Sequence, residues 1–113
     1  MKDALDIRFE ETAKGGRYFI VMPNEEQSRL TFVRAGEGHI IADHTFVPPP
    51  YRNQGVAEAM VERLVADARA GGVKITPTCW FVADEFERHR PDWDDVLAGV
   101  GAGGVDRIDQ PGE

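Results

Sequence analysis

Three consecutive prolines, Pro48–Pro50, divide the chain into two parts. The sequence before them is typical of β-strands, and the sequence after them is expected to begin with a helix. Proline donates no backbone hydrogen bond and disfavours helix at the residue before it. The segments before the prolines are rich in β-branched and aromatic residues and are joined by polar or glycine-containing turns. Strands are expected at Leu5–Glu10, Arg17–Met22, Leu30–Arg34 and His39–Val47, with turns at Gly15–Gly16, Pro23–Glu26 and Gly36–Gly38. This order predicts an antiparallel meander.

The pattern after the prolines has the period of a helix. Val56, Met60 and Leu64 recur four residues apart, and charged residues lie on the opposite side. Gly71–Gly72 is expected to end this helix, because glycine adopts the left-handed conformation found at helix C-termini. A strand, a short helix and one further turn are expected to follow at Val73–Thr78, Phe81–His89 and Asp92–Leu97.

The order of elements predicts an α/β (α+β) domain with one mixed sheet. A strand–helix–strand unit makes its two strands parallel, with a right-handed crossover, so the fourth and fifth strands are expected to be parallel. One domain is expected over residues 1–98, and residues 99–113 are expected to form a mobile Gly-rich tail.

Composition excludes several classes of protein. The chain has 113 residues, of which 42% are apolar, as in globular proteins, and its net charge of −7 argues against binding to nucleic acid or anionic membranes. No apolar run approaches the roughly 20 residues of a membrane span, and the first residues do not resemble a signal peptide. The single cysteine, Cys79, excludes an internal disulfide. A reducing, cytoplasmic location is therefore expected.

The segment Arg52–Ala57 lies where the last strand of the meander is followed by the helix. The first turn of a helix has unpaired N–H groups and a positive dipole end, and Gly55 lets a ligand approach the backbone. These features suit a phosphate or pyrophosphate. The alternative is an ordinary helix start, capped by Asn53 or Gln54 with Arg52 solvated, and the pattern alone favours it. The motifs of P-loop and dinucleotide-binding proteins do not fit.

A longer stretch, His44–Ala57, resembles the acyl-CoA loop of the GNAT N-acetyltransferase superfamily, whose signature is Gln/Arg-x-x-Gly-x-Gly/Ala. Pro77–Val82 and His89–Trp93 further resemble motifs of its compact, single-domain (YjdJ-type) branch, and they occur in the order found there. The similarity extends over roughly residues 27 to 97, which is most of the domain.

This resemblance implies a function, a donor and a site. Acetyl-CoA would bind where the fourth and fifth strands splay apart, with its pantetheine along the fourth strand and its pyrophosphate on the helix amides. Pro77 gives a separate reason to expect the splay, because proline is out of place in a paired central strand. The implied acetyl-CoA-binding residues are Phe46, Val47, Arg52, Asn53, Gln54, Gly55, Val56 and Ala57.

Cys79 is the first candidate for the acetyl end of the site. It lies in phase with Val73 and Ile75, so its side chain is expected on their face. A lone cysteine in such a place is most often a small buried hydrophobe. The start of a helix also favours the thiolate, and the resemblance implies that a cysteine of this motif lies beside the acetyl group.

His44 is the second candidate. It is expected on the strand face shared by Ala42 and Phe46, with Asp43 on the other face. A histidine there is more often a hydrogen-bonded structural residue, but an imidazole near the splay can also accept a proton from an amine.

No metal site is expected, because His39, His44 and His89 are scattered. His89 and Arg90 are interpreted as a favourable helix end, or alternatively as cations near the nucleotide of CoA. One departure from the family pattern concerns the tyrosine that many members use to protonate the leaving thiolate. No tyrosine follows Tyr51 in this sequence.

Two functions follow. The first is acetyl-CoA-dependent N-acetyltransfer to an unidentified amine, with Cys79 and His44 as catalytic residues. The second is an acyl-CoA-binding module with little or no turnover, which the missing tyrosine favours. The amine acceptor and the oligomeric state do not follow from the sequence.

Overall fold

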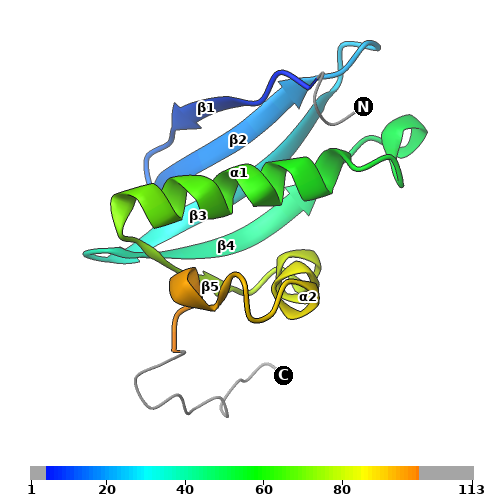
Figure 1. Ribbon diagram of the computed structural model, residues 1–113. Helices are drawn as coiled ribbons and strands as arrows, with labels where there is room; N and C mark the ends of the chain where they lie inside the picture. Colours follow the sequence, from blue (N-terminus) through cyan, green and yellow to red (C-terminus); the bar gives the residue numbers. More distant parts are fainter. Residues whose placement is uncertain (1–4, 100–113) are drawn as a thin grey trace.

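The computed structural model describes residues 5–99 and contains one five-stranded sheet of order β1-β2-β3-β4-β5 (Figure 1). Strands β1 to β4 form an antiparallel meander, and β5 is parallel to β4. The predicted mixed sheet is confirmed. The strands are β1 Arg8–Glu11, β2 Gly15–Val21, β3 Gln27–Gly36, β4 His39–Phe46 and β5 Lys74–Pro77; the helices are η2 Pro49–Tyr51, α1 Val56–Gly71, α2 Trp80–Arg88 and η3 Asp94–Val96. The predicted tail lies almost entirely outside the described residues.

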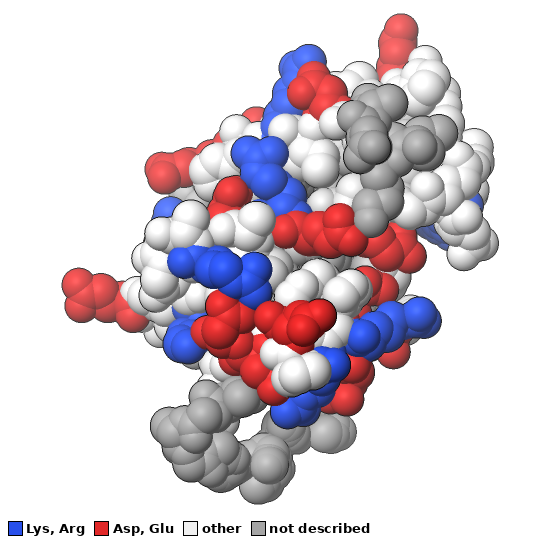
Figure 2. All heavy atoms as spheres, in the orientation of Figure 1, with Lys and Arg blue, Asp and Glu red and all other residues white. Residues whose placement is uncertain are grey.

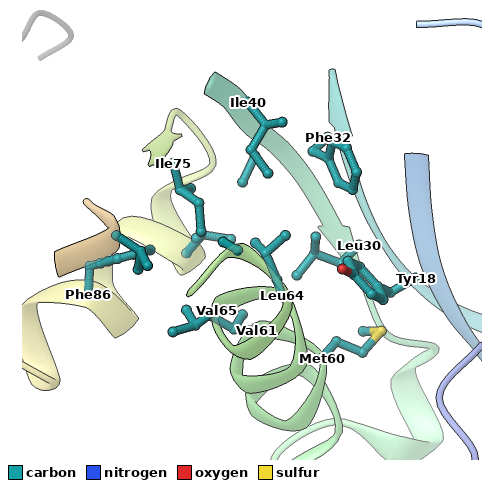
Figure 3. Packing of buried hydrophobic residues seen from close by; sticks show 14 of the residues in the cluster. Tyr18, Leu30, Phe32, Ile40, Met60, Val61, Leu64, Val65, Ile75 and Phe86 are labelled. Carbon is teal, nitrogen blue, oxygen red and sulfur yellow. The ribbon is translucent and has the colours of Figure 1, made fainter. Parts of the chain in front are cut away.

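Helix α1 crosses one face of the sheet and buries its apolar stripe there (Figures 1 and 3). Met60 and Leu64 pack among side chains from three strands, including Leu30, Ile40 and Ile75, and all five are at most 9% exposed. Burial of one such side chain contributes roughly 1.5–3 kcal/mol. The helix ends where predicted, with Gly72 in the left-handed conformation at φ 70°.

Helices α2 and η3 also contact α1, so these three helices lie on one side of the sheet. We call the opposite side of β2, β3 and β4 the open face. The side chains on the open face include those of Arg17, Phe19, Arg29, Thr31, His44 and Phe46. None of the described helices is long and apolar enough to cross a bilayer.

The prediction of a turn at Gly15–Gly16 is wrong, because both glycines lie in β2. They are needed for close packing within the sheet. A Cβ on Gly15 would lie 2.2 Å from the carbonyl oxygen of Phe32, and one on Gly16 would lie 2.7 Å from the ring of Phe9. The chain turns instead over residues 12–14, where the Thr12 hydroxyl accepts a hydrogen bond from the Gly15 amide.

Acidic and basic side chains are mixed across the α1 side of the molecule (Figure 2). Most of the pairs that they form are exposed, such as Arg63–Asp67 at 3.2 Å and Arg88–Asp84 at 2.9 Å. Exposed pairs of this kind contribute little to stability. The fold therefore depends on the core between α1 and the sheet.

Candidate functional site

Pairing between β4 and β5 ends halfway along β4. The last paired residues are Ala42 and Pro77, and the Ala42 carbonyl then accepts hydrogen bonds from the amides of Thr78 and Cys79 at 3.0 and 3.1 Å. Beyond this point, β4 continues to Phe46 and pairs only with β3 among the described strands. The edge of β4 that faces the start of α2 therefore has no strand partner from residue 43 to residue 46 within residues 5–99. We call this unpaired edge, together with the start of α2 beside it, the wedge.

A β-bulge lies at the start of the wedge. Thr31 pairs with His44 and Phe32 pairs with Ala42, so Asp43 is an extra residue in β4. A bulge shifts the alternation of side chains along its strand. His44 therefore lies on the open face beside Thr31, whereas Ala42 is buried on the α1 side.

The predicted faces of His44 and Asp43 are wrong for this reason. His44 does not share a face with Ala42, although it does share one with Phe46. Asp43 lies on the same side as His44, because its carboxylate accepts a 2.7 Å hydrogen bond from the Thr31 hydroxyl. A strict two-residue period, which sequence reasoning assumes, cannot register an inserted residue.

Helix α1 begins at the mouth of the wedge with no side chain capping its amides. Its N-cap is Gly55, at φ 86°, and no side-chain hydrogen bond caps the helix. Neither Asn53 nor Gln54 serves as a cap, so that alternative is wrong. Gln54 donates instead to the Pro50 carbonyl at 3.0 Å, and Asn53 adopts a positive φ of 63°. The first amides of α1 are thus left for solvent or a ligand.

Arg52 is held against the end of β4. Its Nε donates a 2.6 Å hydrogen bond to the Val47 carbonyl, and its guanidinium lies 5.6 Å from the centre of the Phe46 ring. The alternative of a merely solvated Arg52 is therefore wrong. Arg52 remains exposed, so its charge is accessible at the mouth of the wedge.

The other residues predicted to bind acetyl-CoA flank the same loop. Val47 and Val56 are buried, at 7% and 2% exposure, and Phe46 and Ala57 are half-buried. Because these two side chains are buried in the core, Val47 and Val56 would contact a ligand through their backbone groups. Here Val47 and Val56 fix the backbone on either side of the loop.

Cys79 lies across the wedge from β4, as the N-cap residue of α2. Its sulfur is 3.3 Å from the hydroxyl of Thr45, and the half-buried side chain packs against the core together with Val73. Thr45 pairs with the buried Leu30 and so faces α1, on the opposite side of β4 from His44. The structure therefore places Cys79 and His44 on different sides of the wedge.

Helix α2 carries a buried carboxylate that the sequence analysis did not single out. Glu85 is only 4% exposed. Burial raises its pKa, nearby Glu58 raises it further, and His89 and Arg88 oppose the shift.

His89 lies at the end of α2, as the C-cap residue. Its ring stacks on Trp93 with ring centres 3.8 Å apart, and its Nδ1 lies 2.9 Å from the Glu85 carbonyl. These contacts agree with the interpretation of His89 as part of the helix end.

A hollow of about 180 Å³ lies elsewhere, beside the C-terminal half of α1. Tyr18, Asp67 and His39 are among its lining residues, and the Tyr18 hydroxyl donates a 2.7 Å hydrogen bond to Asp67. Burial and this hydrogen bond raise the pKa of Tyr18. None of the predicted acetyl-CoA-binding residues lines the hollow.

In residues 5–99, no three His, Cys, Asp or Glu side chains lie together in a group that could hold a metal ion.

Residues 17–96 match the family described as GCN5-related N-acetyl-transferase. The chain belongs to this family. The match includes the wedge, the bulge, the start of α1 and Cys79, and it confirms the superfamily that the sequence motifs indicated. Membership of its compact branch stays a prediction.

A solution structure of a GCN5-like candidate N-acetyltransferase from Staphylococcus aureus has a similar fold. The two proteins are 23% identical, with a TM-score of 0.64, and the match covers 85% of this chain and 92% of that one. At this identity the likeness shows the fold alone. No curated protein matches the chain significantly.

Proposed function

We propose that this family member transfers an acetyl group from acetyl-CoA to an amine, and that acetyl-CoA binds in the wedge. The observation that carries the proposal is the end of β4–β5 pairing at Ala42, directly ahead of the uncapped start of α1. An open strand edge offers hydrogen bonds to the pantetheine amides, and uncapped helix amides suit a pyrophosphate.

The phosphate end of the site is formed by Arg52 and the loop that follows it. The amides at the start of α1 would donate to the pyrophosphate, and Arg52 would add a positive charge. Gly55 leaves the approach to these amides open, because it has no Cβ. Asn53 and Gln54 are exposed beside them and can donate further hydrogen bonds.

The acetyl end would lie near the bulge, between Cys79 and His44. Acetyl-CoA supplies an activated thioester, and an amine attacks its carbonyl carbon, so that a C–N bond forms as the C–S bond breaks. His44 is exposed on the open face and would accept the proton that the amine loses. Since no tyrosine follows Tyr51, the leaving thiolate would take its proton from solvent. Cys79 would border the thioester from the α1 side.

The alternative is a module that binds acyl-CoA with little or no turnover. The missing tyrosine favours it, and so does the open face, because α1, α2 and η3 all lie on the other side of the sheet and form no acceptor pocket there. Mass spectrometry of a panel of amines incubated with protein and acetyl-CoA separates the two. Acetylated product that disappears in Cys79→Ala supports the enzyme, and tight binding without product across the panel supports the module.

Cys79 should react with iodoacetamide near neutral pH within minutes, and saturating acetyl-CoA should slow the reaction by roughly tenfold or more. Because Cys79 is the only cysteine, intact mass reports its labelling directly. The reference for a core thiol is the double variant Cys79→Ala, Ser28→Cys, since Ser28 is fully buried in β3. That variant should label only on unfolding. If Cys79 behaves like the reference and acetyl-CoA gives no protection, its place in the site is refuted.

A further inference from the structure

Two arginines differ from all others in the described chain. Residues 5–99 contain nine arginines, and seven have a carboxylate within 4.0 Å. Arg29 and Arg52 are the two that take part in no ion pair within these residues. In a chain of net charge −7, which has a surplus of carboxylates, two unpaired arginines require an explanation.

Both unpaired arginines contact the same ring. The guanidinium of Arg29 lies 4.7 Å from the centre of the Phe46 ring, and that of Arg52 lies 5.6 Å from it. Arg29 comes from β3, where it pairs with Phe46, and Arg52 comes from the loop before α1. We call Arg29 and Arg52 the arginine pair.

The two charges of the arginine pair are close enough to repel each other. Since both lie near one ring centre, they are at most about 10 Å apart, roughly one Debye length at 0.1 M salt. No carboxylate within residues 5–99 pairs with either of them. Arg52 uses one side-chain N–H on the Val47 carbonyl, and the Arg29 guanidinium donates no hydrogen bond to a protein group within residues 5–99. Most of their donors are therefore available to an anion.

Arg17 shows that stacking on a ring does not itself leave an arginine unpaired. Arg17 also lies on the open face, 4.5 Å from the ring centre of its neighbour Phe19. It nevertheless pairs with Glu10 at 3.3 Å. Arg29 has the same kind of aromatic support and no acid, at the end of the sheet next to the wedge.

We infer that Arg29 is a second cation of the phosphate site, acting with Arg52 on a phosphate of CoA. Phe46 would hold the two guanidiniums in place, and a phosphate that bridges them beside the ring would offset their repulsion by accepting charge-assisted hydrogen bonds. The inference rests on the proposed function for the identity of the ligand. The pyrophosphate and the 3′-phosphate of CoA share this chemistry.

Arg29→Gln tests the inference, with Arg17→Gln as the matched control. Titration calorimetry would measure the affinity of each variant for CoA, for dephospho-CoA, which lacks the 3′-phosphate, and for acetyl-pantetheine, which lacks every phosphate. Arg29→Gln should weaken CoA binding by roughly tenfold or more and leave acetyl-pantetheine binding unchanged. Arg17→Gln should bind CoA within about twofold of the wild type.

Dephospho-CoA identifies the phosphate, and either result supports the inference. If Arg29→Gln weakens dephospho-CoA as much as CoA, Arg29 contacts the pyrophosphate; if it weakens CoA alone, Arg29 contacts the 3′-phosphate. Unchanged CoA binding by Arg29→Gln would overturn the inference, as would an equal loss for acetyl-pantetheine or in Arg17→Gln. These outcomes would overturn only the role of Arg29 if the wild type binds CoA and Gly55→Val weakens that binding, because the proposed function would then remain supported. A wild type that binds no CoA compound overturns both.

Discussion

Replacing Gly55 by valine is expected to weaken acetyl-CoA binding by roughly 100-fold or more, since in the proposed site several charge-assisted hydrogen bonds to the phosphates would depend on this backbone. Gly55 has a φ of 86° at the N-cap of α1. A β-branched residue strongly disfavours this conformation, so the backbone would rotate and the first amides of α1 would change direction. The added side chain would also occupy space next to these amides. Titration calorimetry measures the affinity, and circular dichroism checks that the variant is folded.

Gly72→Val is the matched control, because Gly72 lies at the other end of the same helix. Its φ is 70°, and nothing lies within 4 Å of an added Cβ. Valine should therefore cause comparable backbone strain and a comparable loss of stability there, with acetyl-CoA affinity within about twofold of the wild type. Wild-type affinity in Gly55→Val would place the phosphates elsewhere. An equal loss in both variants would show that helix strain, and not the site, controls binding.

Gly15→Ala is expected to destabilise the fold by about 3 kcal/mol or more, at the upper end of the range for single substitutions. The new Cβ would lie 2.2 Å from the carbonyl oxygen of Phe32 and 2.7 Å from the Cα of Val33. Both contacts are with backbone atoms of β3, so no side-chain rotation relieves them. Strands β2 and β3 would have to separate locally and lose ladder hydrogen bonds. Denaturant unfolding followed by circular dichroism measures the change.

Gly71→Ala provides the comparison for the same chemical change. Gly71 is the last residue of α1, and an added Cβ would lie 3.7 Å from a methyl group of Val73, an ordinary contact distance. Alanine should be neutral or should stabilise the chain by up to about 1 kcal/mol. If Gly15→Ala unfolds at the same denaturant concentration as the wild type, then β2 and β3 do not approach as closely as described.

The sequence predicted the elements whose signals are local. The apolar spacing of Val56, Met60 and Leu64 was sufficient to predict α1, and the glycines Gly71–Gly72 were sufficient to predict where it ends. The glycines at the start of β2 were misassigned, because a Gly–Gly pair is usually a turn signal. Glycine is required at these two positions because Phe32 and Phe9, on the neighbouring strands, lie too close to leave room for a side chain. Such tertiary contacts leave no periodic signal in one sequence.

The candidate site could likewise be predicted only where its signals are local in the sequence. The loop Arg52–Ala57 could be located, because a strand, a glycine and a helix are contiguous in the sequence. The face of His44 could not be predicted, because the bulge at Asp43 arises from register with β3. The contact between Arg29 and Phe46 could not be predicted for a similar reason, since only strand pairing brings the two together. The one hint of the bulge in the sequence is the adjacent polar pair Asp43–His44, which interrupts the alternation of β4.

Backbone amide chemical shifts during an acetyl-CoA titration test the central claim most directly, because every non-proline residue reports on its own position. We expect the largest changes at Gly55, Val56 and Ala57, with a second group over residues 43–46 of β4 and at Cys79. The hollow beside the C-terminal half of α1, where Gly38 and Val73 report, should change little. Changes concentrated at the hollow, or no changes at saturating acetyl-CoA, would contradict the proposal that the wedge binds acetyl-CoA.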